Sequence, residues 1–186
     1  MSVQTMRLRF TVDDYYQMID LGMIKNVERA EIIEGELIKQ MPIGKRHAAC
    51  VKKLDELLRD ELGKSVTYSV QDPIFLDEFN EPQPDVALLE RRDDFYSGKA
   101  PMAQDVLLLI EVSDSTLDYD RNRKIPLYAK HEIPEVWLIN LVNGTIEIHC
   151  QSSDYSYNLV KILGRGEVIQ SEILPNLRLE VTTILD

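Results

Sequence analysis

The sequence predicts one mixed α/β domain, with a central sheet covered by helices and an extra helix and hairpin at the N-terminus. Its 186 residues are 44% hydrophobic and 28% charged, which is typical of a globular domain with a sizeable core. Short apolar runs of strand character alternate with stretches of helical period. No repeat, linker or low-complexity tract divides the chain, so we expect a single domain over residues 1–186.

The N-terminal elements are predicted from their caps and turns. Thr11 followed by acidic residues is typical of a helix start, and Gly22 ends that helix. Residues 30–41 indicate two short strands folded at Glu34-Gly35.

A long amphipathic helix follows over residues 46–62 and ends at Gly63. Its apolar side chains at helical spacing are Cys50, Val51, Leu54, Leu57, Leu58 and Leu62. Two strands come next, a loosely alternating one over residues 66–76 and a short apolar one over residues 85–89, which follows two prolines.

The centre of the sheet is predicted from two runs that are almost wholly apolar, residues 105–112 and 135–140. Such runs are typical of strands buried on both faces. Between them a helix over about residues 119–131 is a candidate right-handed crossover. Pro126 removes one backbone hydrogen bond in it and predicts a kink or an early helix start.

The C-terminal part is predicted to be β-rich. Asn143-Gly144 is a strong hairpin signal that leads into a strand over residues 145–150. Further strands near residues 157–163 and 177–181 are expected to complete an edge of the sheet or a lid.

Charge composition restricts the function. The 21 basic and 32 acidic residues give a net charge of −11, which argues against strong non-specific binding of a polyanion. Basic residues are concentrated in two segments, where they form either a local basic rim around an acidic site or simply solvated helix faces. These residues are Lys45, Arg46, His47, Lys52, Lys53, Arg121, Arg123, Lys124 and Lys130.

The cellular setting is predicted to be cytoplasmic. No apolar run approaches the ~18 residues of a membrane span, and residues 1–10 lack the apolar block of a signal peptide. Cys50 and Cys150 have no metal-type spacing, which together with the missing signal favours a reducing compartment.

Two carboxylates at strand ends are the main candidate site. Because side chains alternate along a strand, Glu111 shares a face with Leu109, and Asp85 shares a face with Ala87. If the two strands pair antiparallel, Asp85 and Glu111 approach each other, and two close carboxylates favour Mg²⁺. Taken singly, Asp85 is equally a turn acceptor and Lys124 a solvated surface residue, so the hypothesis depends on the three occurring together.

In this setting Asp85, Glu111 and Lys124 resemble the PD-(D/E)xK nuclease superfamily. The chain is most similar to a bacterial family named "putative restriction endonuclease", and the resemblance covers most of residues 11–150. The matching stretches are Glu31-Ile32-Ile33-Glu34-Gly35-Glu36-Leu37, His47, Pro84-Asp85-Val86, Ile110-Glu111-Val112-Ser113, Asp120-Arg121-Asn122-Arg123-Lys124-Ile125-Pro126-Leu127-Tyr128-Ala129 and Ile133-Pro134-Glu135-Val136-Trp137-Leu138. The resemblance implies a restriction-endonuclease-like fold.

One position departs from the superfamily pattern. The usual lysine stands two residues after the glutamate, where this chain has Ser113. In the family that the chain resembles, a lysine on the following helix substitutes for it, and Lys124 matches that place. Its long side chain is expected to bring the ammonium back over the strand end.

The resemblance implies a metal-dependent endonuclease that hydrolyses DNA phosphodiester bonds. Asp85, Glu111 and the Val112 carbonyl would hold Mg²⁺ or Mn²⁺, and Lys124 would orient the attacking water or stabilise charge on the phosphate. Accessory roles are expected for Glu31, His47 and Tyr128, with Glu34, Glu56 and Glu61 as rivals for an additional acidic group. A homodimer would suit cleavage of both strands.

Two other classes of function remain open from the sequence. The net charge of −11 and the displaced lysine favour a nuclease-fold binding or regulatory module with little or no activity. Alternatively, Asp85 and Glu111 only form ion pairs in an interaction protein. The choice between DNA and RNA, the recognised sequence and the biological role are not determined by these motifs.

Overall fold

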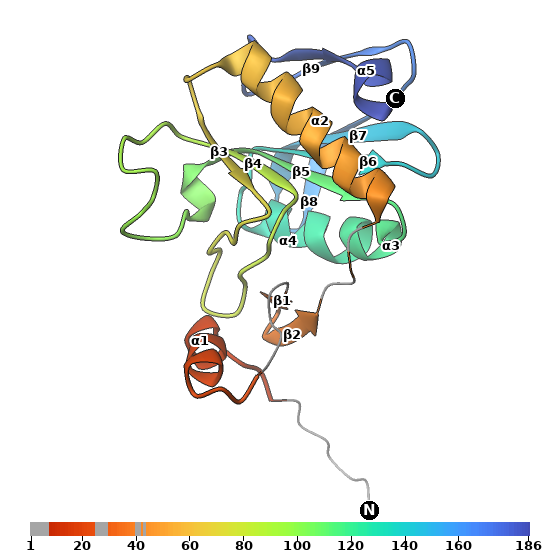
Figure 1. Ribbon diagram of the computed structural model, residues 1–186. Helices are drawn as coiled ribbons and strands as arrows, with labels where there is room; N and C mark the ends of the chain where they lie inside the picture. Colours follow the sequence, from red (N-terminus) through yellow and green to blue (C-terminus); the bar gives the residue numbers. More distant parts are fainter. Residues whose placement is uncertain (1–7, 25–29, 40–41, 43) are drawn as a thin grey trace, which may run out of the picture.

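The computed structural model describes residues 8–24, 30–39, 42 and 44–186. A six-stranded sheet lies between one long helix on one face and a broken helix on the other, and a small helix–hairpin unit lies at one end (Figure 1). The elements are α1 Val12–Asp20, β1 Ala30–Ile33, β2 Glu36–Lys39, α2 Lys45–Leu62, β3 Thr67–Val70, β4 Val86–Leu89, η1 Ala103–Asp105, β5 Val106–Ser113, α3 Leu117–Tyr119, η2 Asp120–Lys124, α4 Ile125–Lys130, β6 Glu135–Asn140, β7 Thr145–Ser153, β8 Ser156–Gly164, β9 Val168–Gln170, β10 Arg178–Glu180 and α5 Val181–Leu185. The predicted mixed α/β class is confirmed.

The main sheet has the strand order β3-β4-β5-β6-β7-β8. Only β5 and β6 are parallel, and the connection between them carries α3, η2 and α4, so the predicted crossover between these two strands is confirmed. The other neighbours pair antiparallel. The crossover begins at the end of β5, so α3 and η2 lie next to that strand end.

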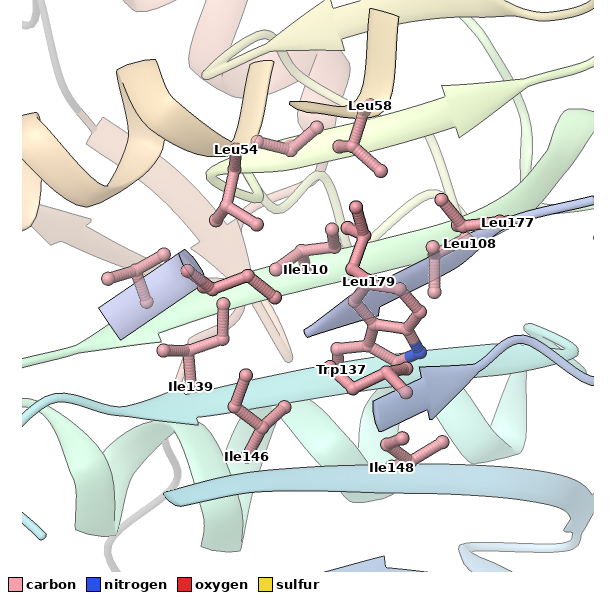
Figure 2. Close-up of a cluster of buried hydrophobic side chains, with 14 of the residues drawn as sticks. Leu54, Leu58, Leu108, Ile110, Trp137, Ile139, Ile146, Ile148, Leu177 and Leu179 are labelled. Atoms are coloured by element: carbon pink, nitrogen blue, oxygen red, sulfur yellow. The ribbon is translucent and has the colours of Figure 1, made fainter. Parts of the chain in front are cut away.

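Two apolar layers bury the sheet. On one face α2 contributes Leu54 and Leu58 to a cluster with Ile110 and Trp137 (Figure 2). On the opposite face Tyr128 of α4 packs in a second cluster. Because β5 and β6 contribute to both clusters, their continuous apolar sequence is explained by burial on two sides, as predicted.

The N-terminal helix and hairpin are confirmed. Thr11 and Asp14 form a reciprocal capping box at the start of α1, and the β1–β2 hairpin turns at Glu34 and Gly35. A backbone bridge between Ile32 and Glu81 joins the hairpin to the loop before β4. This attachment places β1 close to the ends of the central strands.

Several predicted boundaries were wrong. The strand expected over residues 66–76 ends at Val70, because Gln71 adopts a left-handed backbone conformation with φ of 59°. The segment near residues 177–181 is not part of the main sheet; β10 pairs with β9 in a separate two-stranded sheet. The predicted edge strand near residues 157–163 is confirmed, since β8 ends the main sheet.

The helix predicted over about residues 119–131 consists of three pieces, α3, the π-helical turn η2 and α4. Pro126 is in the first turn of α4, where a missing backbone donor is tolerated. Of the two expected alternatives, a kink or an early helix start, the structure shows a helix that starts again next to Pro126, directly after the π-helical turn. The π-helical turn immediately before Pro126 ends at Lys124.

The buried carboxylate of Glu135 attaches the C-terminal segment to the sheet. It accepts hydrogen bonds from Trp137 Nε1 at 2.6 Å, Ser171 Oγ at 2.8 Å and the backbone N–H groups of Glu172 at 2.9 Å and Ile173 at 3.1 Å. Glu135 itself is fully buried. All of these donors lose their acceptor if the carboxylate is removed.

Glu135→Ala is therefore expected to lower the free energy of unfolding by about 3–5 kcal/mol, since it leaves several buried donors unsatisfied. Urea unfolding followed by tryptophan fluorescence measures this loss. Glu172→Ala is the matched control, because the Glu172 side chain is about half exposed and forms a surface ion pair with Lys161, which contributes little to stability. Equal effects of the two substitutions would contradict the role of Glu135.

Within the part of the chain that the structure describes, none of the helices combines the length and apolarity that a membrane crossing requires. Cys50 on α2 and Cys150 on β7 are both buried free thiols. Burial is the main factor that raises the pKa of Cys50 to about 11 and that of Cys150 to about 12, so neither thiol is reactive at neutral pH.

Candidate active site

Asp85 and Glu111 converge at one end of the sheet. Strand β4 pairs antiparallel with β5, and Val86 lies opposite Ile110. Asp85, which precedes Val86, is therefore next to Glu111, which follows Ile110. The expected antiparallel pairing is thereby confirmed. Both carboxylates and Lys124 line one cavity of about 360 Å³. The residues that contribute to this cavity are Glu31, Ile38, Lys39, Pro42, Gly44, His47, Gln83, Asp85, Glu111, Val112, Asp114, Ser115, Thr116, Tyr119, Asp120 and Lys124.

Asp85 is buried but surrounded by donors. Its Oδ2 accepts hydrogen bonds from His47 Nε2 and from the Val112 backbone N–H, each at 2.9 Å, and its Oδ1 accepts one from Gln71 Nε2 at 3.0 Å. Burial by itself would raise the pKa of Asp85, but these donors, His47 foremost, hold the pKa below its usual value. Asp85 is therefore ionised at neutral pH.

Glu111 is in a less polar setting. Its Oε1 accepts hydrogen bonds from Tyr128 Oη at 2.5 Å and from Lys124 Nζ at 2.7 Å, and the residue is only 3% exposed. Burial raises the pKa of Glu111 to about 8; Lys124 opposes the rise, whereas the nearby carboxylates of Asp120 and Asp85 add to it. The ammonium of Lys124 is the cation in contact with this carboxyl group.

Lys124 lines the cavity and lies between two glutamates. Its Nζ is 2.7 Å from Glu111 Oε1 and 3.4 Å from Glu31 Oε2, and its side chain is 3% exposed. Burial alone would lower the pKa of Lys124, but Glu111 and Glu31 outweigh this and hold the pKa well above its ordinary value. The expected reach of this side chain back to the strand end is confirmed.

The structure also brings the three accessory candidates to this site. Glu31 on β1 pairs with Lys124 and accepts a hydrogen bond from the Gln83 backbone N–H at 3.1 Å. His47, in the first turn of α2, holds Asp85, and the fully buried Tyr128 holds Glu111. Each of the three therefore contacts a member of the Asp85–Glu111–Lys124 set rather than standing apart from it.

The rival acidic residues lie elsewhere. Glu34 is exposed and pairs with Arg123, and Glu56 is exposed on α2. Glu61 lines a different hollow, between the end of α2 and the β9–β10 sheet. None of these three side chains contributes to the cavity that contains Asp85.

The predicted basic rim is only partly present around the cavity. From the first predicted segment, His47 lines the cavity, and Arg46 Nη1 lies 3.8 Å from Oδ1 of the lining residue Asp114. Lys39, which is outside both segments, lines it as well. In the second basic segment Lys124 enters the cavity, whereas Arg121 pairs with Glu147 and Arg123 with Glu34 and Glu36. Most of these cations are therefore neutralised by neighbouring carboxylates.

The donor set is compatible with a hard divalent cation that keeps part of its water shell. Among the described residues, no group of three or more His, Cys, Asp or Glu side chains is arranged to hold a metal ion. Mg²⁺, however, usually takes one or two protein carboxylates and several waters, and Asp85 and Glu111 with the neighbouring backbone of Val112 meet that need. The carboxylates of Asp120 and Asp85 near Glu111 favour a further positive charge at this position.

Two polar residues at the site were not anticipated from the sequence. Gln71 holds Asp85 from the loop after β3, and Asp120 accepts hydrogen bonds from Ser113 and Thr116 beside the cavity. The left-handed backbone conformation of Gln71, which ends the strand, cannot be predicted from the pattern of apolar residues. Asp120 stands in the motif that carries Lys124, so its position in that motif was the available signal.

A mixed sheet with an acidic pair at one end, a crossing helix on each face and a lysine against the pair defines a restriction-endonuclease-like α/β protein. The chain belongs to the family Uma2, described as "Putative restriction endonuclease", which residues 12–182 match. The resemblance drawn from the motifs is thereby confirmed.

A solved structure supports the fold. The protein described as a putative nuclease belonging to DUF820 from Anabaena variabilis ATCC 29413 superimposes with a TM-score of 0.70 over 95% of this chain and 97% of that chain. The two sequences are 16% identical, so this similarity concerns the fold. Among curated proteins, none matches the chain.

Proposed function

We propose that the protein is a metal-dependent endonuclease that hydrolyses phosphodiester bonds in DNA. The observation that carries the proposal is the meeting of Asp85, Glu111 and Lys124 in a single cavity, although they come from three separate elements. Membership of a family described as putative restriction endonucleases supports the same reaction class. The choice of DNA as substrate and of Mg²⁺ or Mn²⁺ as cofactor is part of the proposal.

In this mechanism Asp85, Glu111 and the Val112 carbonyl would hold the ion. When bound, the ion would lower the pKa of a water molecule and polarise a phosphate oxygen. His47 and Gln71 keep Asp85 ionised and oriented, and their hydrogen bonds require no change when substrate arrives.

Lys124 supplies a fixed positive charge where negative charge increases on the phosphate. It remains protonated throughout the neutral range, because two glutamates hold its pKa high. Tyr128 restrains Glu111 through a hydrogen bond of 2.5 Å to Oε1, the oxygen that Lys124 also contacts. Such preorganised charges need little rearrangement in the transition state, which is how they accelerate phosphoryl chemistry.

Conversion of supercoiled plasmid to open-circular and linear forms tests the proposal. We expect cleavage with Mg²⁺ or Mn²⁺ and none after chelation. Glu56→Ala, which removes an exposed carboxylate of α2 outside the cavity, is the control that should cleave like the wild type. Prompt linearisation would support the proposed homodimer, whereas accumulation of the nicked form would indicate independent single-strand cuts.

Metal affinity is expected to depend on pH. Since the pKa of Glu111 is about 8, most metal-free molecules carry a proton there at neutral pH, and a cation must displace it. Affinity for Mn²⁺ should therefore rise by up to about tenfold per unit between about pH 6 and pH 8 and then level off. Asp85, whose pKa is lowered, releases no proton in this range.

Calorimetric Mn²⁺ titrations in buffers of different ionisation enthalpy measure both the affinity and the released protons. About one proton per ion is expected at pH 6 and fewer as the pH approaches 8. Glu111→Gln should bind Mn²⁺ weakly and without this pH dependence. A wild-type affinity that does not change with pH would show that Glu111 is not a ligand.

A binding or regulatory module is the second candidate function. It is favoured by the net charge of −11 and by the neutralisation of Arg121 and Arg123 by neighbouring acids. Under this alternative the wild type binds Mn²⁺ and DNA but leaves the plasmid intact. The same titration and plasmid assay thus separate the two functions.

A further inference from the structure

A carboxylate with no role in the mechanism so far lies between the end of β5 and the turn that carries Lys124. Asp120 is the first residue of η2, and Lys124 is the last. The carboxylate is 6% exposed and lines the same cavity as Asp85 and Glu111. Burial of such a group costs free energy unless its hydrogen bonds compensate.

One oxygen of Asp120 connects three segments of the chain. Its Oδ2 accepts hydrogen bonds from Ser113 Oγ and from Thr116 Oγ1, each at 2.6 Å. Distances of about 2.5–2.7 Å are typical of hydroxyl donors to an ionised acceptor. Ser113 ends β5 and Thr116 is the N-cap of α3, so this carboxylate ties the strand end to the start of the crossover.

The turn between Asp120 and Lys124 is not held by regular α-helical hydrogen bonds. The backbone N–H of Ile125 donates to the Asp120 carbonyl, which is the wider π-helical spacing. Pro126 follows and has no N–H to offer to the preceding turn. The direction of the Lys124 side chain therefore depends on other contacts that hold this turn in place.

We propose that Asp120 is a positioning residue that acts through Lys124. Together with Ser113 and Thr116 it fixes η2 against the end of β5, and the Lys124 ammonium consequently rests on Glu111. This inference rests on the proposed nuclease function, in which Lys124 faces the reacting phosphate. If Asp120 only positions the turn, an uncharged acceptor oxygen at this place is sufficient. If Asp120 were a metal ligand or a proton acceptor, its negative charge would be required.

Two substitutions at Asp120 separate these roles. Asp120→Asn keeps an oxygen that both hydroxyls can reach, and Asp120→Ala removes it. We expect the alanine variant to lower kcat for nicking about 100-fold, with KM and Mn²⁺ affinity unchanged. The asparagine variant should stay within about tenfold of the wild type, because neutral acceptors are weaker than charged ones.

Controls address charge and folding. Asp118→Ala removes an exposed carboxylate from the same crossover and is expected to leave kcat within about twofold of the wild type. If Asp120→Ala does not fold, the double variant Ser113→Ala and Thr116→Ala removes the same hydrogen bonds from the donor side. This double variant should reproduce the loss of kcat.

Crystal structures of the variants test the inference without relying on activity. Lys124 Nζ should remain in contact with Glu111 in Asp120→Asn and move away in Asp120→Ala. An asparagine variant as inactive as the alanine variant would overturn the proposal, and so would an unmoved Lys124 in Asp120→Ala. If the wild type cleaves no DNA, the nuclease function fails, while these structures still decide the positioning role.

Discussion

Replacing Lys124 with methionine is expected to lower the rate of plasmid nicking about 10²–10³-fold while Mn²⁺ still binds. Lys124 Nζ lies 2.7 Å from Glu111 Oε1 and is the ammonium in contact with the acidic pair, so its loss removes the charge that is proposed to face the phosphate. Metal affinity should be unchanged or higher, because a positive charge leaves the neighbourhood of a cation site. Nicking kinetics and calorimetry of the same preparation measure the two effects.

Methionine is chosen because it occupies nearly the same buried volume as the lysine stem. Lys124 is the main contact that opposes the rise in the pKa of Glu111, so its loss raises that pKa further and leaves Glu111 neutral, which limits the damage to the fold. Arg123→Met is the matched control, since Arg123 is in the same turn and pairs with Glu34 and Glu36 outside the cavity. Undiminished nicking by Lys124→Met would assign the charge-stabilising role to another group.

The central fold was predictable because apolar patterns report burial directly. Residues 135–140 form β6 with the predicted bounds, and the asparagine–glycine hairpin that follows them was also predicted. The pattern failed where a tertiary contact determines the backbone. Gln71 leaves the strand to hold Asp85. β10 lies within the predicted residues 177–181, but it pairs with β9, which was not predicted, and Glu135 holds the segment that follows β9.

The site was predictable in its members but not in its network. Strand alternation places Asp85 beside Glu111, and the side-chain length of Lys124 allows it to reach them. The π-helical turn is not visible in the sequence, because Pro126 predicts only that regular hydrogen bonding fails nearby. The contact of Asp120 with Ser113 depends on how that turn packs against β5, which no local pattern encodes.

Asp85→Asn should abolish both metal binding and cleavage while it leaves the fold intact. We expect Mn²⁺ affinity to fall at least about 100-fold and nicking about 10³–10⁴-fold, because the ionised carboxylate is lost. The asparagine oxygen can still accept from His47 and Val112, as Asp85 Oδ2 does. Its amide then faces Gln71, whose own amide can rotate to present oxygen.

The substitution therefore removes the charge but keeps the hydrogen bonds. The free energy of unfolding of Asp85→Asn in urea should match that of the wild type within about 1 kcal/mol. Asp72→Asn is the control, since Asp72 lies close in the chain, pairs with Ser69 and is outside the cavity. Wild-type Mn²⁺ affinity in Asp85→Asn would place the ion elsewhere and remove the basis of the nuclease proposal. A different result would support the binding module: the wild type binds Mn²⁺ but does not cleave DNA, and Asp85→Asn does not bind Mn²⁺. The carboxylate pair would then hold an ion that performs no hydrolysis.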